Sequence, residues 1–255
     1  MKSFEVIVIG AGPGGYVAAI RAAQLGYSTA IVEKESALGG TCLRVGCIPS
    51  KALLESSELY AQTAHHLTQH GIEVNTPKLR LDTMLGRKQK IVEELTLGVK
   101  LLMQKNKIQV LEGHGSFVEP GVLVVVQTDG TRTSYGYTSA IVATGSAPVE
   151  IPSFPFDHKL ILDSTDALAL SNVPQKMLVV GAGAIGLEMG CVWQRLGCEV
   201  TVVEMFDRIA PFADKQISKA YQRTLERQGL TFLLGHQVKR VQTKKKSVLV
   251  DVEDR

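Results

Sequence analysis

The stretch FEVIVIGAGPGG, residues 4–15, predicts the fold of this chain. Its first half is an apolar, β-branched run typical of a buried parallel strand, and its second half is a glycine turn of the form GxGxxG. An alanine-rich helix is expected from there to Leu25, where Gly26 ends it. Residues 28–32 predict a second strand that leads into Glu33. Strand, glycine turn, helix, strand and acid follow in the order of a dinucleotide-binding unit.

The glycines and the acid have separate physical roles in such a unit. Gly10 allows the tight turn, and Gly12 allows the backbone to approach a pyrophosphate closely. Gly15 allows the helix to pack closely on the strand, whereas Glu33 is placed to bind ribose hydroxyl groups. A GxGxxG sequence alone would be weak support, but here the strands, the helix and the acid all stand in the expected order.

The same pattern occurs a second time in residues 177–204, with a glycine turn at 181–186. A single offset of 171 residues (181 − 10 = 171) carries the glycines and the acid of the first copy onto Gly181, Gly183, Gly186, Gly197 and Glu204. Two such units in one chain predict two dinucleotide sites and electron transfer between two cofactors.

Glu204 indicates which nicotinamide cofactor the second unit takes. A carboxylate there can accept hydrogen bonds from both hydroxyl groups of an adenosine ribose but would repel a 2′-phosphate, so NAD is favoured over NADP. Arg208 is the counter-argument, because it is close enough in sequence to reach such a phosphate. We expect NAD because Glu204 is present.

Between the two units lies LGGTCLRVGCIPSKAL, residues 38–53, which contains two cysteines. Pro49 fits the first turn of a helix, so Cys47 is expected just before a helix N-terminus, where the helix dipole stabilises a thiolate. Cysteines are often buried as small apolar residues. We nevertheless interpret Cys42 and Cys47 as a redox-active disulfide, because flanking glycines permit close ligand approach and a dinucleotide unit directly precedes them.

The segment GGTCLRVGCIPSK, residues 39–51, resembles the active-site signature of the flavin disulfide reductase family, and residues 48–51 are most similar to the members that oxidise dihydrolipoamide. The resemblance implies an enzyme that binds FAD at the first dinucleotide-binding unit and NAD at the second. It also implies that the full-length protein is a homodimer. Its implied partner is the lipoyl domain of a 2-oxo acid dehydrogenase complex or of the glycine cleavage system. Arg44 departs from the many members with Asn; we expect it in an exposed loop, where it can alter substrate access.

The resemblance also assigns roles to four residues. Cys42 is implied to exchange with the substrate dithiol, and Cys47 to face the flavin. Lys51 is implied to place its charge near the flavin and to pair with Glu188. On the sequence alone, Lys51 is a solvated helix lysine and Glu188 is an acid in the first turn of a helix.

The resemblance places a wider set of residues at the two cofactors. Those implied at FAD are Gly10, Gly12, Pro13, Gly14, Gly15, Glu33, Lys34, Gly39, Gly40, Thr41, Cys42, Gly46, Cys47, Lys51, Gly115, Ala143, Thr144, Gly145 and Ser146. Those implied at NAD are Gly181, Gly183, Ala184, Ile185, Gly186, Glu204 and Val238.

The predicted fold class is α/β, with two Rossmann-like domains in which helices and an antiparallel β-meander cover a parallel sheet. The FAD-binding domain with the cysteine pair is expected at residues 1–146, and the NAD-binding domain at 147–255, beginning with a proline-rich linker. The other expected helices are 49–69, 81–104 and 214–227, and the other expected strands are 108–111, 122–127, 134–142, 230–234, 238–242 and 247–252.

The family resemblance also identifies what this sequence lacks. A C-terminal dimerisation domain and its catalytic His–Glu pair have no counterpart, so the chain is expected to be the N-terminal part of a longer enzyme and a poor catalyst by itself. Two other functions remain open. One is a sister reductase of glutathione or mercuric ion, disfavoured by Glu204 because such enzymes generally use NADPH. The other is a non-catalytic nucleotide-binding fragment.

Composition argues against several other classes. The formal net charge is only +3 and the basic residues are scattered, so no nucleic-acid partner is expected. No apolar stretch approaches the roughly 20 residues that cross a membrane, and glycines interrupt the apolar N-terminal run, so we expect a cytoplasmic protein. We expect no metal site, because His66 and His70 lack a third ligand, and we expect structural roles for Cys191 and Cys198.

Overall fold

The computed structural model of the chain describes residues 1–254. Residue contacts group these residues into two compact units. The first unit comprises residues 1–49 and 89–147, and the second comprises residues 50–88 and those from 148 onward. Both units are discontinuous in sequence, whereas the domains predicted above are continuous. The predicted boundary between residues 146 and 147 stays a prediction.

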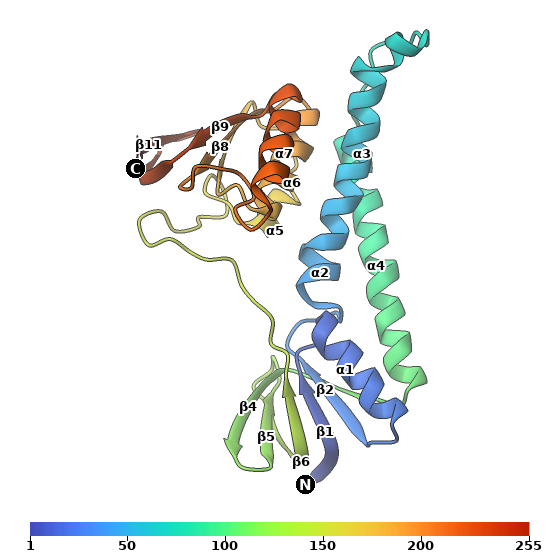
Figure 1. Cartoon of the computed structure of the whole chain (residues 1–255). Coiled ribbons are helices and arrows are strands. Elements are labelled where there is room, and N and C mark those ends of the chain that lie inside the picture. Colours follow the sequence, from blue (N-terminus) through green and yellow to red (C-terminus); the bar gives the residue numbers. More distant parts are fainter. Residues whose placement is uncertain (255) are drawn as a thin grey trace. The chain divides into compact units, whose positions relative to one another are not determined.

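The first unit is built on one mixed sheet with the strand order β3-β2-β1-β6-β5-β4 (Figure 1). Strands β3, β2, β1 and the second half of β6 run parallel, whereas β4, β5 and the first half of β6 form the antiparallel meander. The strands are β1 (Lys2–Ile9), β2 (Thr29–Glu33), β3 (Gln109–Glu112), β4 (His114–Glu119), β5 (Val122–Val126) and β6 (Arg132–Val142).

Alternation along the parallel strands sends side chains to two different layers. Val8 and Ile31 pack in one apolar cluster with residues of helices α1 (Pro13–Gln24) and α4 (Leu81–Lys105). Ile7 and Val32, one position away on the same strands, pack in a second cluster with residues of the meander. Successive strand residues face opposite sides, so a continuous apolar run is buried on both. The first unit therefore has three layers, in agreement with the predicted fold class.

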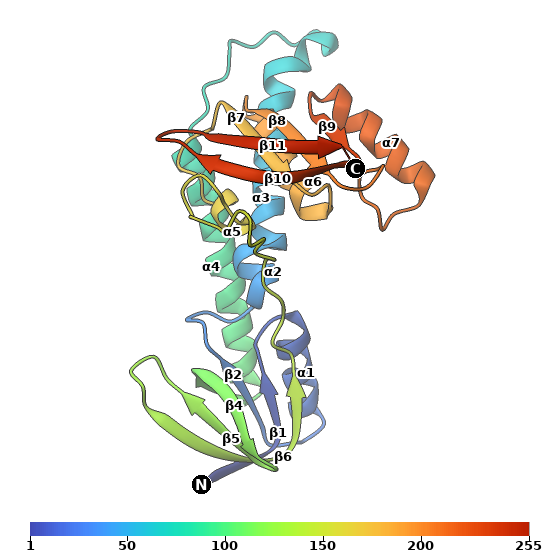
Figure 2. The same cartoon turned by 90° about the vertical axis from the view of Figure 1, so that its left-hand side faces the viewer.

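The second unit repeats this plan around a parallel sheet with the order β7-β8-β9. Helix α6 packs on one face of the sheet, where Trp193 is fully buried, and the hairpin β10-β11 packs on the other face around Val203 and Val238 (Figure 2). The elements are α5 (Ser164–Ala167), β7 (Lys176–Val180), α6 (Ala184–Arg195), β8 (Glu199–Glu204), α7 (Lys215–Arg227), β9 (Thr231–Leu234), β10 (His236–Thr243) and β11 (Val248–Asp254).

Short elements are where the structure differs from the prediction. Helix α2 (Gly40–Val45) and helix α5 were not predicted, because each is too short to show a periodic apolar pattern. Strand β4 was not predicted because its sequence does not alternate between apolar and polar residues. Helix α3 (Cys47–His65) ends earlier than predicted, and a 3-10 helix follows over Leu67–His70. His66 and His70 therefore do not share one α-helix as supposed. No helix in residues 1–254 is both long and apolar enough to cross a membrane.

Candidate active site and dinucleotide sites

The glycine loop between β1 and α1 requires glycine at two positions. Gly10 has a φ of +97°, and a Cβ there would lie 2.2 Å from the carbonyl oxygen of Ala143. A Cβ on Gly15 would lie 1.7 Å from the carbonyl oxygen of Gly10. Gly12 caps α1 in an extended conformation, with Pro13 at the first helical position. The N-terminal N–H groups of α1 thus open onto a backbone cradle, which suits a pyrophosphate.

Glu33 ends β2 beside this loop and is only 7% exposed. Its Oε2 accepts a hydrogen bond of 2.8 Å from the Ala11 N–H, and its Oε1 accepts one of 3.0 Å from the Glu35 N–H. A carboxylate oxygen has two lone pairs, so each oxygen retains capacity to accept from a ribose hydroxyl. The arrangement holds Glu33 in place before any ligand binds.

The cysteine segment is attached directly to this cradle. Gly39 has a φ of +111°, and its N–H donates to the carbonyl oxygen of Ala11 at 2.8 Å. Gly40 has a φ of +58°, and a Cβ there would lie 2.4 Å from the Cα of Gly12. Only glycine permits this approach of backbone to backbone. The chain that enters α2 therefore lies against the predicted pyrophosphate loop.

Cys42 and Cys47 stand on two successive helices. Cys42 lies in α2, half-buried against the apolar cluster beneath α1, whereas Cys47 is exposed as the first residue of α3. Gly46 separates the helices, where a Cβ would lie 2.8 Å from the carbonyl oxygen of Thr41. The helix starts at Cys47 itself, two residues before Pro49.

Arg44 does not lie in an exposed loop, and that expectation is wrong. It lies in the last turn of α2, its side chain is 23% exposed, and its Nη2 is 3.0 Å from the Glu35 Oε2. The side chain is thus bonded to the loop that follows β2. A guanidinium at a helix C-terminus also interacts favourably with the helix dipole.

The second glycine loop, between β7 and α6, reproduces the first. Gly181 has a φ of +98°, and a Cβ on Gly186 would lie 2.3 Å from the carbonyl oxygen of Gly181. Glu204 is 6% exposed, and its carboxylate accepts hydrogen bonds from the N–H groups of Ala182 at 2.7 Å and Phe206 at 3.0 Å. The second loop therefore has the same backbone cradle as the first, with a buried carboxylate in the same place.

Arg208 is held by its own loop. Its Nη2 donates to the carbonyl oxygen of Pro211 at 3.1 Å, and its Nη1 is 3.9 Å from the Asp207 carboxylate. Its Nε is buried with no hydrogen-bond partner in residues 1–254. The guanidinium therefore contacts its own loop through Nη1 and Nη2, whereas the carboxylate of Glu204 lies at the end of β8.

Lys51 and Glu188 come together in the second unit. The Lys51 Nζ lies 2.5 Å from the Glu188 Oε1, and the Ser50 Oγ donates to the Glu188 Oε2 at 2.9 Å. Ser50 is 4% exposed, so the hydroxyl fixes one oxygen of the carboxylate in a buried contact. This contact of Ser50 was not predicted; the only signal in the sequence is its position directly before Lys51.

The remaining predicted cofactor residues occupy varied environments. Gly115 lies in strand β4, and a Cβ there would be 3.3 Å from the Val32 side chain. The Ala143 N–H donates to the carbonyl oxygen of Ile9 at 2.8 Å, which extends β6 to the edge of the first glycine loop. Val238 is 7% exposed, and its side chain packs in the core beneath the β10-β11 hairpin.

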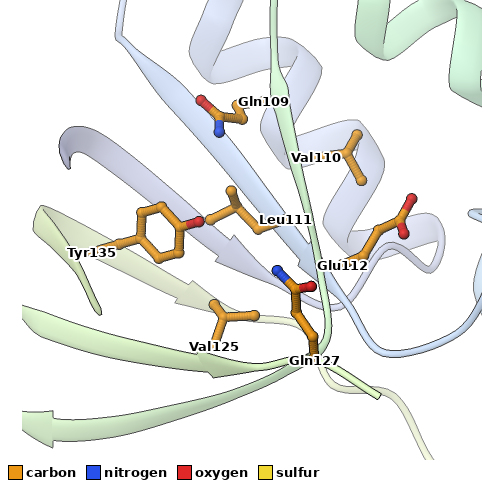
Figure 3. A pocket seen from close by; sticks show the side chains of 7 residues that line it. All are labelled: Gln109, Val110, Leu111, Glu112, Val125, Gln127 and Tyr135. Atoms are coloured by element: carbon orange, nitrogen blue, oxygen red, sulfur yellow. The ribbon is translucent and has the colours of Figure 1, made fainter. Parts of the chain in front are cut away.

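Two buried cysteines and one pocket are not among the predicted sites. Burial raises the pKa of the Cys191 thiol, and burial also raises the pKa of Cys198, to about 11. Figure 3 shows a pocket between β3 and the meander, in which Tyr135 points its hydroxyl toward Leu111. None of the seven residues that line it is one that the sequence predicts at a cofactor.

A His158, Asp163 and Asp166 cluster was also not predicted. Its potential ligand atoms lie within 4.8 Å of one another. The side chains already bond to one another: the His158 Nδ1 is 2.9 Å from the Asp166 Oδ2, and Asp163 and Asp166 form the capping box of α5. We therefore interpret the three side chains as the N-terminal cap of the short helix α5.

Comparison with known proteins identifies the family. Residues 4–255 match the family described as pyridine nucleotide-disulphide oxidoreductase. The mitochondrial dihydrolipoyl dehydrogenase of Pisum sativum is 49% identical over 98% of this chain and 50% of the relative. Dihydrolipoyl dehydrogenase 3 of Pseudomonas putida is 48% identical over 93% of this chain and 51% of the relative. Leghemoglobin reductase of Glycine max is 49% identical over 98% of this chain and 48% of the relative.

A solved structure shows the same likeness. It is the copper(II) complex of a mutant of the HOCl-induced flavoprotein disulfide reductase RclA from Escherichia coli, with a TM-score of 0.82 and 25% identity over 99% of this chain and 54% of that one. The chain belongs to the pyridine nucleotide-disulphide oxidoreductase family, and the resemblance drawn from residues 39–51 is confirmed. It spans about half the length of the curated relatives it matches.

Proposed function

We propose that this chain carries the redox centre of an NAD-dependent dihydrolipoyl dehydrogenase, which oxidises protein-bound dihydrolipoamide to lipoamide. The observation that carries the proposal is the backbone contact between Gly40 and Gly12, where a Cβ would come within 2.4 Å of the neighbouring Cα. It joins the helix that carries Cys42 to the loop expected to bind a dinucleotide. The dihydrolipoyl dehydrogenases at 46–49% identity support this choice of substrate.

The residues present fit both cofactors. The first unit, with its glycine cradle and the buried carboxylate of Glu33, suits FAD, and the cysteine segment leads from it directly. The second unit suits NAD, because Glu204 is positioned for two ribose hydroxyls and opposes a 2′-phosphate. When bound, the flavin supplies the means of passing an electron pair from a thiolate to NAD⁺ as a hydride.

Thiol chemistry is the contribution of the chain itself. One thiolate of dihydrolipoamide attacks the Cys42 sulfur of the Cys42–Cys47 disulfide, which forms a mixed disulfide and releases Cys47 as a thiolate. The second substrate thiol then attacks its own partner sulfur, which closes lipoamide and releases Cys42 as a thiol. The substrate loses two electrons and two protons; the cysteine pair gains both electrons, Cys42 takes up one proton, and the other proton is released to solvent. The reduced pair is reoxidised at the expense of NAD⁺.

Lys51 and Glu188 are proposed to set the charge beside the flavin. Lys51 follows Cys47 by four positions in the same helix, and residues at that spacing lie on one helix face. The Ser50 hydroxyl holds the Glu188 carboxylate, which in turn pairs with the lysine, so the positive charge has a defined place. A fixed cation there stabilises negative charge on a reduced flavin.

The wider setting is part of the same proposal. We propose a homodimer that serves a 2-oxo acid dehydrogenase complex or the glycine cleavage system, in the cytoplasm. The second candidate is a sister flavoprotein reductase, favoured by the leghemoglobin reductase relative at 49% identity. Glutathione and mercuric reductases are disfavoured by the ribose-binding geometry of Glu204.

The visible absorption spectrum of the purified protein tests the proposal. A yellow protein that gains a long-wavelength band on anaerobic addition of dihydrolipoamide, and that then reduces NAD⁺ in preference to NADP⁺, is the expected result. The band reports a Cys47 thiolate against the flavin. A yellow protein that gains no band with dihydrolipoamide but gains one with another dithiol would favour the sister reductase. A protein that binds no flavin would contradict the proposal.

A further inference from the structure

We propose that the Arg44–Glu35 ion pair is a positioning contact that couples occupancy of the first dinucleotide site to the placement of Cys42 and Cys47. This inference rests on the proposed function, because it takes the cysteine pair as the redox centre. It concerns a residue that departs from the family pattern. Its basis is the geometry of the loop between β2 and α2.

Three consecutive contacts link the first glycine loop, through the carboxylate of Glu33, to the helix that carries Cys42. The Ala11 N–H donates to the Glu33 Oε2 at 2.8 Å, and the Glu35 N–H donates to the Glu33 Oε1 at 3.0 Å. The Glu35 side chain then accepts from the Arg44 Nη2 at 3.0 Å. The Glu33 carboxylate already accepts hydrogen bonds from the glycine loop and from Glu35. A ligand that also bonds to this carboxylate is therefore linked to both segments.

Helix α2 depends on such contacts because it is short. It has six residues, and a helix of that length is not stable by itself in water. Two other contacts anchor its N-terminal end, the Gly39 N–H to the Ala11 carbonyl oxygen and the close approach of Gly40 to Gly12. Arg44 stands in the last turn, so its ion pair restrains the opposite end, between Cys42 and Cys47.

The contact is partly protected from solvent. The Arg44 side chain is 23% exposed and the Glu35 side chain is 44% exposed. Ion pairs of this exposure make modest contributions, so we expect an effect of about two- to fivefold on FAD affinity. If the pair positions the cysteines, its removal should lower both the affinity for FAD and the signal of the Cys47 thiolate beside the flavin. A simple surface ion pair would change neither quantity.

The experiment is a double-mutant cycle on the purified FAD-loaded protein. The variants are Arg44→Gln, Glu35→Gln, the two combined, and the reversed pair Arg44→Glu with Glu35→Arg. Lys90→Gln is the matched control, because it removes another ion pair of the first unit, with Glu94 at 3.9 Å on the exposed face of α4. The two readouts are the FAD dissociation constant and the intensity of the long-wavelength band after anaerobic addition of dihydrolipoamide.

We expect each single variant to weaken FAD binding about two- to fivefold and to reduce the band, the double variant to be no worse than either single one, and the reversed pair to recover both readouts. The control should match the unmodified protein. Single variants that equal the unmodified protein, or effects that simply add in the double variant, would overturn the inference. If the unmodified protein binds FAD but gains no band, the proposed function fails instead, and the cycle in FAD affinity still decides the coupling.

Discussion

The two glycine loops of this chain share their hydrogen bonds and differ in what surrounds them. Gly10 and Gly181 have φ values of +97° and +98°, and their N–H groups donate to Val32 and Val203 at the same distance of 2.8 Å. The correspondence continues past the acids, where Gly39 and its counterpart Ala210 donate to the alanines of their loops at 2.8 Å. The 171-residue offset is therefore a repeat in structure as well as in sequence.

The surroundings of the loops separate the two copies. A Cβ on Gly10 would lie 2.2 Å from the Ala143 carbonyl oxygen, whereas a Cβ on Gly181 would meet no atom within 4 Å in the described part of the chain. The offset also places Ala213 and Ser218 at the positions of Cys42 and Cys47. The glycine motif is therefore common to both copies. The two copies differ in the residues that surround the motif and in those that follow it, which include the cysteine pair of the first copy.

The cysteine positions give the largest expected difference between the copies. Cys42→Ser should abolish dihydrolipoamide oxidation and leave flavin bound, because serine cannot form the disulfide while the cradle is untouched. Cys198→Ala, in the second unit, should retain the rate, because that thiol is buried and structural. Steady-state oxidation and the flavin spectrum measure both. An unchanged rate in Cys42→Ser would refute the assigned role.

Alanine at the first glycine of each loop probes the difference in enclosure. Gly10→Ala should destabilise the fold by about 2–5 kcal/mol, because a left-handed φ and a clash with the Ala143 carbonyl oxygen act together. Gly181→Ala should cost about 1–2 kcal/mol, from the φ strain alone. Urea unfolding measures both values. Equal losses of unfolding free energy in the two variants would mean that the Ala143 carbonyl group can move away from the new Cβ at position 10 at no energetic cost.

The buried acids test how similar the copies are. Glu33→Gln and Glu204→Gln should each cost about 1–3 kcal/mol, because the new amide group turns a donor toward a backbone N–H group. The losses in affinity should fall on different cofactors, on FAD for Glu33→Gln and on NAD for Glu204→Gln. Flavin titration and the KM for NAD⁺ separate them. A loss of the same cofactor in both variants would contradict the assignment of the sites.

The smallest expected effect concerns the buried thiol of Cys198, whose pKa in the folded protein is raised to about 11 from an ordinary value of 9.0. Below the pKa of the unfolded state, the Cys198 thiol is neutral in both the folded and the unfolded protein, so its contribution to stability is fully present. As pH rises through the window between these pKa values, the unfolded state ionises first and stability falls. Cys198→Ala should flatten this part of a plot of unfolding free energy against pH. An unchanged slope would show that another group titrates there.

The long-range plan of the fold followed from the sequence because its signals are local. Each GxGxxG loop, its flanking strands and its acid lie within one short segment, so the glycine spacing predicts the turn and the apolar runs predict strands buried on both faces. The family signature at residues 39–51 likewise pointed to the cysteine pair, and the comparisons confirm that resemblance.

Contacts between distant residues could not be predicted in this way. The direction of the Arg44 side chain depends on where Glu35 lies after the loop has folded, and the loop contains two glycines with positive φ. The bond of Ser50 to Glu188 joins residues far apart in the chain. Strand β4 carries an exposed, largely polar sequence that has no alternating pattern, because only part of its surface meets the core.

The discontinuity of the two units affects how the chain can fold during synthesis. Residues 50–88 belong with residues from 148 onward, so they leave the ribosome well before the rest of their unit has been made. The first unit is also incomplete until residue 147 has been translated. Domains commonly fold one after another as they emerge, and exposed apolar surface in the interval promotes aggregation. The apolar face of α3, which includes the fully buried Leu53, must therefore wait for its partners on the nascent chain.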